Sequence, residues 1–296
     1  MKFNPIVKRD LTVGSRSTRL TVLITALNAV LLGVDILAIF GRFAAFRLEA
    51  RMDYRSMLYV YCIAVGVVFL FVLFLYPAMT VGSITTERDS GTMDLMLASG
   101  LSSRRIVFGK FISGLLPGLV LLATFLPGLV LPLLFGGVEV TSCLQVLLLF
   151  VPMAMEMLCI GLYASARTRS GASAGVAAYV IVLGITLLPL AAAALLRGMN
   201  SAGENPAAFL IVLSPVTPAA GLLADQVGEN ALLETVTRWL RVPGVLTEGS
   251  TLIITGAAVQ VLAALLFFFA ASSKAAPDRR RKRGRRTGKQ LQTEEK

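Results

Sequence analysis

Residues 82–110 read GSITTERDSGTMDLMLASGLSSRRIVFGK, and they separate two long apolar runs of the chain, 57–81 and 111–135. Connections between packed helices usually need only about 2–8 residues. This one is longer, is interrupted by glycines, and carries charged residues of both signs: Glu87, Arg88, Asp89, Asp94, Arg104, Arg105 and Lys110. Such a segment is expected to have a structure of its own.

The rest of the sequence is suited to lipid. Hydrophobic residues make up 56% of the chain and charged residues only 15%, whereas soluble domains have about 25% charged residues. A helix needs about 20 mostly apolar residues to cross a bilayer. The stretches that meet this requirement are 20–40, 57–81, 111–135, 144–164, 175–196 and 251–271. The sequence therefore predicts an all-α polytopic membrane protein, with six transmembrane helices between 20 and 271.

The distribution of charge predicts how these helices are oriented. With six spans, most of the 28 Lys and Arg residues fall on the side that holds residues 1–19, the insert 82–110 and the tail 272–296. Basic residues mark the cytoplasmic side of a membrane, so both termini and the insert are expected in the cytoplasm. The net charge of +11 then needs no nucleic acid partner, and the tail is expected to be disordered and to rest on anionic lipids.

A seventh apolar stretch, 206–223, reads PAAFLIVLSPVTPAAGLL and contains several prolines. Broken helix at membrane depth must be covered by protein, so we expect a re-entrant element in the external segment 197–250, before the sixth span. The same segment contains apolar residues that share one helical face: Leu232, Leu233, Val236, Trp239 and Leu240.

The insert itself predicts two short helices. Thr86 and Asp89 have the spacing of a capping box, with Thr86 as the N-cap. Gly100 can end this first helix. Ser102 or Ser103 can cap the second, which would continue directly into the third span. The insert would thus be attached to the membrane at both ends.

The segment ERDSGTMDLMLASGLSSRRIVFGK resembles the signature loop of type-2 ABC transporter permeases. Gly100 stands where that family usually has Pro. Residues 3–11 are similar to the family's amphipathic lead-in helix, and 206–223 to its external re-entrant element. The matching positions in the loop are Glu87, Arg88, Asp89, Gly91, Thr92, Leu95, Leu97, Leu101, Ser102, Ile106, Gly109 and Lys110.

The resemblance implies a function for the insert. These residues would form coupling helices that dock on a separate ATPase subunit. The chain would be the permease subunit of an ABC exporter in a bacterial inner or plasma membrane, paired with a second permease chain, identical or related. ATP and Mg²⁺ would be bound by the ATPase, because this chain has no G-x-x-x-x-G-K-[ST] phosphate loop and is not expected to be an enzyme itself.

Three alternatives stay open from the sequence alone. The insert could be an amphipathic loop resting on lipid headgroups. The chain could be a membrane anchor that transmits movement from an ATPase to an external partner without transporting anything. It could also be a secondary transporter, for which the support is the presence of intramembrane carboxyl groups.

Polar residues inside the predicted spans are the remaining candidates for a site. Glu156 and Asp35 are acidic residues at membrane depth, where ionisable groups are costly and often functional. Asn28 and Gln260 are expected to make hydrogen bonds between helices. A copper site is disfavoured, because the chain has no histidine and the alternate spacing of Met153, Met155 and Met157 places them on different helix faces. The three cysteines are expected to pack as small apolar residues.

Overall fold

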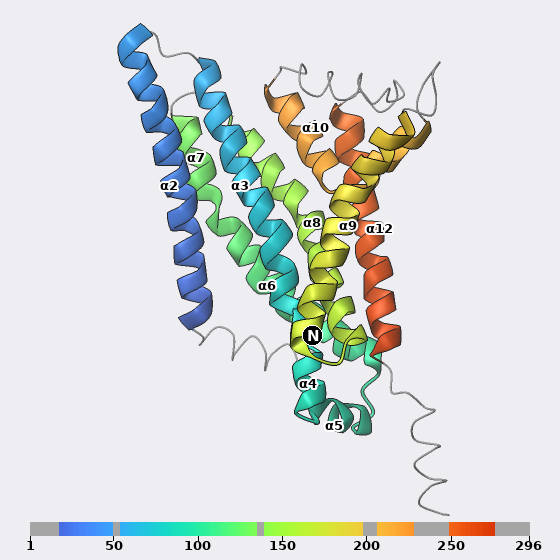
Figure 1. Cartoon of the computed structure of the whole chain (residues 1–296). Helices are drawn as coiled ribbons and strands as arrows, with labels where there is room; N and C mark the ends of the chain where they lie inside the picture. Colours follow the sequence, from blue (N-terminus) through green and yellow to red (C-terminus); the bar gives the residue numbers. More distant parts are fainter. Residues whose placement is uncertain (1–17, 50–53, 135–138, 198–205, 228–248, 276–296) are drawn as a thin grey trace, which may run out of the picture.

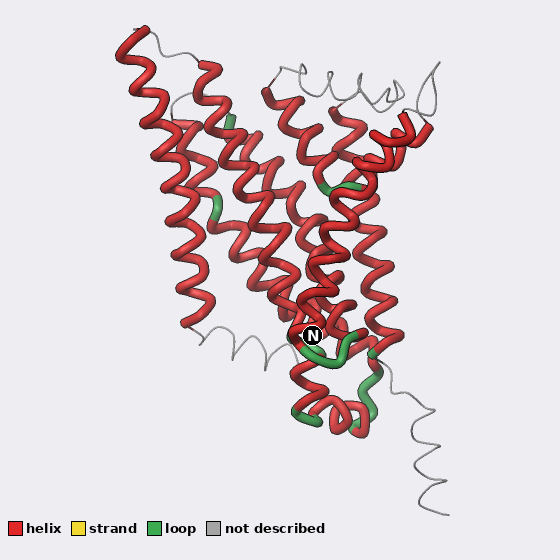
Figure 2. Tube along the Cα trace, viewed as in Figure 1, coloured by secondary structure: helices red, strands yellow, loops and turns green. Residues whose placement is uncertain are grey.

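A computed structural model describes residues 18–49, 54–134, 139–197, 206–227 and 249–275. Within these ranges the regular structure is helical, with no strand (Figure 2). Six helices are long and apolar enough to cross a membrane, as predicted. They comprise α2 (Thr18–Glu49), α3 (Tyr54–Val81), α6 (Ser103–Thr124) continued by α7 (Leu126–Leu134), α8 (Val140–Arg167), α9 (Gly171–Arg197) and α12 (Gly249–Lys274).

The helices extend beyond the apolar stretches that predicted them. The clearest case is α6, which begins at Ser103 rather than at 111. Hydropathy marks only the part of a helix that lies in hydrocarbon, and a helix can continue past that boundary into water. The expected lead-in helix, the apolar face around Trp239 and most of the basic tail lie outside the described residues.

The third span is broken near its middle. Helix α6 continues through Pro117 and ends at Thr124, and α7 begins at Leu126 (Figure 1). Pro127 has no backbone N–H to donate to the carbonyl of Ala123, one turn earlier, so the α-helical ladder is interrupted there. Of the three prolines that the sequence places in this span, Pro127 therefore accounts for the break.

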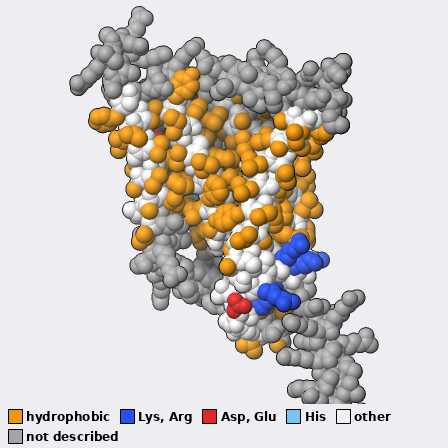
Figure 3. Space-filling model, in the orientation of Figure 1, with side chains coloured by type: hydrophobic (Ala, Val, Ile, Leu, Met, Phe, Trp, Pro, Cys, Tyr) orange, Lys and Arg blue, Asp and Glu red, His pale blue; other side chains and the backbone are white. Residues whose placement is uncertain are grey.

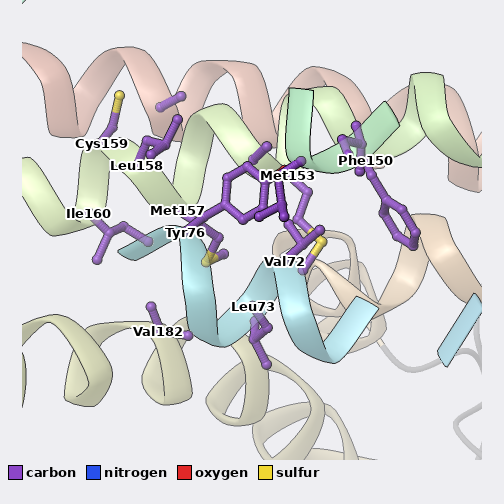
Figure 4. Packing of buried hydrophobic residues seen from close by; sticks show 14 of the residues in the cluster. Val72, Leu73, Tyr76, Phe150, Met153, Met157, Leu158, Cys159, Ile160 and Val182 are labelled. Atoms are coloured by element: carbon purple, nitrogen blue, oxygen red, sulfur yellow. The ribbon is translucent and has the colours of Figure 1, made fainter. Parts of the chain in front are cut away.

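Helix α8 is the centre of the bundle. Its most extensive contacts are with α12 and α3, and it also packs against α9 and α6. Figure 4 shows Val72 and Tyr76 of α3 beside Met153 and Met157 of α8. Both methionines are fully buried and fill the space between the two helices.

Helices α3 and α8 approach each other most closely at Gly161. A Cβ atom placed on Gly161 would lie 2.2 Å from Thr80 Oγ1 and 2.5 Å from the carbonyl oxygen of Pro77. The Thr80 hydroxyl also donates a 2.8 Å hydrogen bond to the Leu158 carbonyl oxygen. The absence of a side chain at 161 is therefore what lets the two backbones meet.

The stretch 206–223 does not form a seventh long helix. It folds as a 3-10 helix, η1 (Pro206–Leu213), and an α-helix, α10 (Val216–Val227), at the opposite end of the bundle from α4 and α5 (Figure 1). The break between them is satisfied internally, because Ser214 Oγ donates 2.9 Å to the Thr186 carbonyl oxygen and Thr217 Oγ1 donates to the Ile211 carbonyl oxygen. Such cover is what a break at membrane depth requires.

Hydrophobic side chains cover the long sides of the bundle. Lys and Arg side chains gather at the end where the short helices α4 (Thr85–Asp89) and α5 (Thr92–Ala98) lie (Figure 3). The same end receives the carboxyl termini of α3 and α8 and the amino terminus of α6 (Figure 1). This end is the place to examine for a functional site.

Candidate functional site

The insert folds as a compact unit below the bundle (Figure 1). Its first part was predicted as one helix, and this was wrong: Gly91, with φ of 72°, divides it into α4 and α5. Gly100, with φ of 83°, ends α5 as predicted. Both values lie in the left-handed region, which glycine adopts without steric cost.

The predicted N-cap of the first helix was also wrong. Helix α4 begins at Thr85 with Ile84 as its N-cap residue, and Thr86 is exposed. The backbone N–H groups at the start of α4 find their acceptor on α8. Ser165 Oγ accepts hydrogen bonds from the backbone N–H of Ile84 at 3.0 Å and of Thr85 at 3.1 Å. A side chain distant in sequence thus does what a local cap usually does.

The second predicted cap is correct in position. Ser102 is the N-cap residue of α6, with an extended backbone and no side-chain capping bond. Its carbonyl oxygen accepts the N–H groups of Arg105 at 2.9 Å and Ile106 at 3.2 Å. Helix α6 therefore starts directly after the turn at Gly100 and continues into the membrane span.

Glu87 connects all three helices of the insert. Its Oε1 accepts a hydrogen bond from Lys110 Nζ of α6 at 2.9 Å, and the two side chains are only 12% and 7% exposed. Thr92, the first residue of α5, donates its hydroxyl to Glu87 Oε2 and lies 3.1 Å from the Glu87 carbonyl oxygen. A largely buried ion pair with additional hydrogen bonds fixes geometry strongly, because removing one partner leaves a buried charge without compensation.

Arg88 attaches the same helix to α8. Its Nη1 donates to the Thr168 carbonyl oxygen at 2.9 Å, and its Nη2 donates to the Ala166 carbonyl oxygen at 3.1 Å. The last carbonyl groups of a helix lack intrahelical partners and carry partial negative charge, so a guanidinium group suits them. We call Glu87, Arg88, Thr92, Lys110 and Ser165 the polar joint.

The remaining predicted residues divide into buried and exposed sets. Ile106 and Gly109 are buried, and Leu97 and Leu101 are partly buried against the core. Leu95 projects from α5 and is 71% exposed. Two further predicted positions, Asp89 and Ser102, are also exposed.

Sequence reasoning missed the α8 side of the polar joint. The bonded residues are far apart in the sequence. Ser165 follows Ile84 by 81 positions, and Ala166 and Thr168 follow Arg88 by 78 and 80 positions. A hydroxyl residue in the last turn of a predicted span was the available signal, and it is weak by itself. The contact of Phe108 with α12 was not predicted either. Phe108 is half exposed, and its ring lies edge-on to that of Phe268, with the ring centroids 6.4 Å apart.

The polar residues of the spans are not part of this joint. Asn28 Nδ2 donates 3.2 Å to Thr124 Oγ1, which confirms the predicted bond between helices. Asp35 lies against Gly128 of α7, fully buried and with no hydrogen-bond partner for either carboxyl oxygen. Glu156 and Gln260 are buried in α8 and α12.

The described residues offer no metal site, since no three His, Cys, Asp or Glu side chains among them are grouped closely enough to hold an ion. The cysteines Cys62, Cys143 and Cys159 are free thiols, and the last two are buried. The contacts described at this end of the molecule are hydrogen bonds and the Glu87–Lys110 ion pair, which attach its helices to one another.

Comparison with known proteins identifies the family of the chain. Residues 23–274 match the family model described as ABC-2 family transporter protein. The match covers α3 through α10, the polar joint and nearly all of α2 and α12. No curated protein matches the chain.

Proposed function

Since the chain belongs to the ABC-2 family of transporter proteins and is a membrane permease subunit of an ABC transporter, we propose that it serves an exporter. In this proposal α4 and α5 dock on a separate ATPase subunit, which binds ATP and Mg²⁺. Two permease chains, identical or related, would pair to enclose the pathway for the substrate.

The observation that carries the proposal is the polar joint. Glu87 ties α4 to α5 and α6 through Thr92 and Lys110, and α4 follows α3 after a short turn. A force applied to α5 therefore reaches the second and third spans without first deforming a flexible loop. An amphipathic loop that only rested on headgroups would not need this ion pair.

Arg88 and Ser165 extend the path to a third span. Both residues bind α4 to the end of α8, through two carbonyl oxygens and two backbone N–H groups. Helix α8 in turn packs along α12. Movement of the insert would therefore displace the centre of the bundle as well as the two spans that flank it in sequence.

The outward face of α5 is the proposed contact with the ATPase. Leu95 is 71% exposed although neighbouring Leu97 and Met93 pack inward. An exposed leucine on a short helix outside the bilayer is suited to a hydrophobic groove on a partner. Asp89, six positions before Leu95, and Arg104, nine positions after it, are exposed as well and would provide a polar rim.

Co-purification with the ATPase tests this proposal. Leu95→Glu should abolish association, because a carboxylate would be buried without a partner. Ser273→Glu should leave association unchanged. It places the same charge on an exposed residue of α12, at the end of the bundle where α4 and α5 lie. Undiminished binding by Leu95→Glu would show that α5 is not the dock.

Reconstitution of the permease and ATPase in vesicles tests the exporter assignment. Export requires ATP-dependent movement of a cargo across the bilayer, together with stimulation of ATP turnover by that cargo. ATP turnover that moves no cargo, with the Leu95 contact intact, would favour the non-transporting role in which the chain drives an external partner.

A further inference from the structure

Two buried oxygen atoms near the middle of the bundle have no hydrogen-bond partner. They are Glu156 Oε2 of α8 and Gln260 Oε1 of α12. The two residues are only 1% and 3% exposed. A buried polar atom without a hydrogen-bond partner destabilises the folded state.

The packing of α8 and α12 places these residues at the same level. Both helices run from the end of the bundle that carries α10 to the end that carries α4 (Figure 1). Tyr163 and Phe267 meet across the interface with their ring centroids 5.5 Å apart. Glu156 lies two helical turns before Tyr163, and Gln260 lies two turns before Phe267.

Residues two turns apart share a helix face, so Glu156 and Gln260 both point into the interface between α8 and α12. The buried residues of α12 follow one face of the helix: Leu252, Gly256, Gln260, Ala264, Ala271 and Ser272. Near its start this face also meets α10, since a Cβ on Gly256 would lie 2.8 Å from Pro218. No pair of helices in the described bundle is in more extensive contact than α8 and α12. The two orphan oxygens therefore belong to the same interface.

Among the residues that the structure describes, no helix packed against α8 carries a cation at the level of Glu156. The helices that pack against α8 are α12, α3, α9, α6, α10 and α7. Their charged residues, and that of α8 itself, all lie near helix ends: Lys274, Arg55, Arg197, Arg104, Arg105, Lys110, Asp225 and Arg167. The other titratable side chains on these helices are thiols and phenols, which carry no positive charge in either of their forms: Tyr54, Tyr59, Tyr61, Cys62, Tyr76, Cys143, Cys159, Tyr163 and Tyr179.

We infer that Glu156 is a proton-binding site: its carboxyl group is neutral, and the hydroxyl formed at Oε2 donates a hydrogen bond to Gln260 Oε1. A carboxylate oxygen and an amide oxygen are both acceptors and cannot pair. One proton converts the first into a donor and satisfies both. Mg²⁺ or Ca²⁺ would need six or more oxygen ligands, and no three His, Cys, Asp or Glu side chains of the described residues are grouped closely enough to hold a metal ion.

The site is distinct from the polar joint, and its existence does not depend on ATPase docking. It makes α8 and α12 a pair that holds together when protonated. Deprotonation would place a charge and two unsatisfied acceptors in the interface that joins the centre of the bundle to its last span. The ligand is the proton alone, taken from water at either surface.

Infrared spectroscopy of the full-length chain in lipid nanodiscs tests this inference. At neutral pH we expect the carbonyl stretch of a neutral carboxylic acid, and Glu156→Gln should remove it. Gln260→Leu should shift the band to higher frequency, because the hydrogen bond that weakens the C=O stretch is lost. Asp35→Asn, which alters the other buried intramembrane carboxyl, should leave the Glu156 band in place.

The wild-type chain gives an independent measurement. Raising the pH should convert the neutral-acid band into carboxylate bands, and the Glu156→Gln variant should lack this change. The inference would be overturned by a neutral-pH spectrum in which Glu156→Gln removes only carboxylate bands. A Glu156 band that Gln260→Leu leaves at the same frequency would equally contradict the proposed hydrogen bond.

Discussion

Two polar regions of this molecule differ in whether their polar groups have hydrogen-bond partners. In the polar joint, Glu87 and Lys110 are paired at 2.9 Å, and Arg88 and Ser165 find partners in backbone groups left over at helix ends. Inside the spans, Asp35, Glu156 and Gln260 leave acceptor oxygens without partners. The first region holds helices together by charge, whereas the second is compatible with its surroundings only when charge is absent.

The difference teaches where rigidity is needed. A unit that projects from the membrane must resist water, which competes for every hydrogen bond, so its bonds are multiple and largely buried. Helices inside the bilayer are held by close packing, and their few polar groups can remain incomplete. The following substitutions test this contrast, beginning with the contact that supports both regions.

Gly161→Val should have the largest effect on stability. Its Cβ would lie 2.5 Å from the Pro77 carbonyl oxygen, which is backbone and cannot rotate away. The expected loss is about 4 kcal/mol or more, above the usual range for overpacking. Gly175→Ala is the matched control, because nothing lies within 4 Å of a Cβ at that position. Thermal unfolding in detergent measures both, and equal midpoints would refute the close contact.

Glu87→Ala should follow, with a loss of about 3 kcal/mol, because Lys110 is left nearly buried without its partner. The double variant Glu87→Leu with Lys110→Leu should recover much of this stability, since no unpaired charge remains. It should still fail to support transport, because the bond between α4 and α6 is gone. A double variant no more stable than Glu87→Ala would indicate that the ion pair is not the source of the loss.

Ser165→Ala should cost about 1–2 kcal/mol, the range for losing a helix cap. The two N–H groups of Ile84 and Thr85 lose their acceptor, so amide hydrogen exchange in α4 should accelerate while that in α9 stays unchanged. Ser165→Thr retains a hydroxyl and is the control. Unaltered exchange in Ser165→Ala would remove Ser165, though not Arg88, from the proposed path of movement.

Asn28→Leu should have the smallest effect, about 0.6 kcal/mol, which is typical of hydrogen bonds between helices in membranes. Asn28 reaches Thr124 just before the break in the third span. Thermal unfolding should therefore change little, in contrast to Glu87→Ala. A loss comparable to that of Glu87→Ala would abolish the contrast between the two regions.

The sequence predicted the six spans and the position of the insert because both are local properties. Apolar stretches of sufficient length and a polar interruption can be read without knowing what packs where. Gly100 as a helix end was predictable for the same reason. Gly91 is an equally local signal, but the prediction of one helix that ends at Gly100 did not use it.

The polar joint could be predicted only in part. Glu87, Arg88, Thr92 and Lys110 were named from a resemblance, but the sequence did not indicate that Glu87 and Lys110 pair across 23 positions. Ser165 could not be found from local pattern, because its role depends on how α3 and α8 approach at Gly161. Contacts of this kind are set by packing between helices, which composition and periodicity do not record.

The division of the third span at Phe125 has a consequence for the geometry of any movement. Both halves contact α2, α3 and α8, but α6 packs most extensively on α8 and also on α12, whereas α7 packs most extensively on α3. The two halves of one span therefore differ in their main neighbour. If the insert moves as proposed, a displacement that enters at Ser103 would be taken up as a change of angle at Phe125, and the inner half would tilt relative to the outer half.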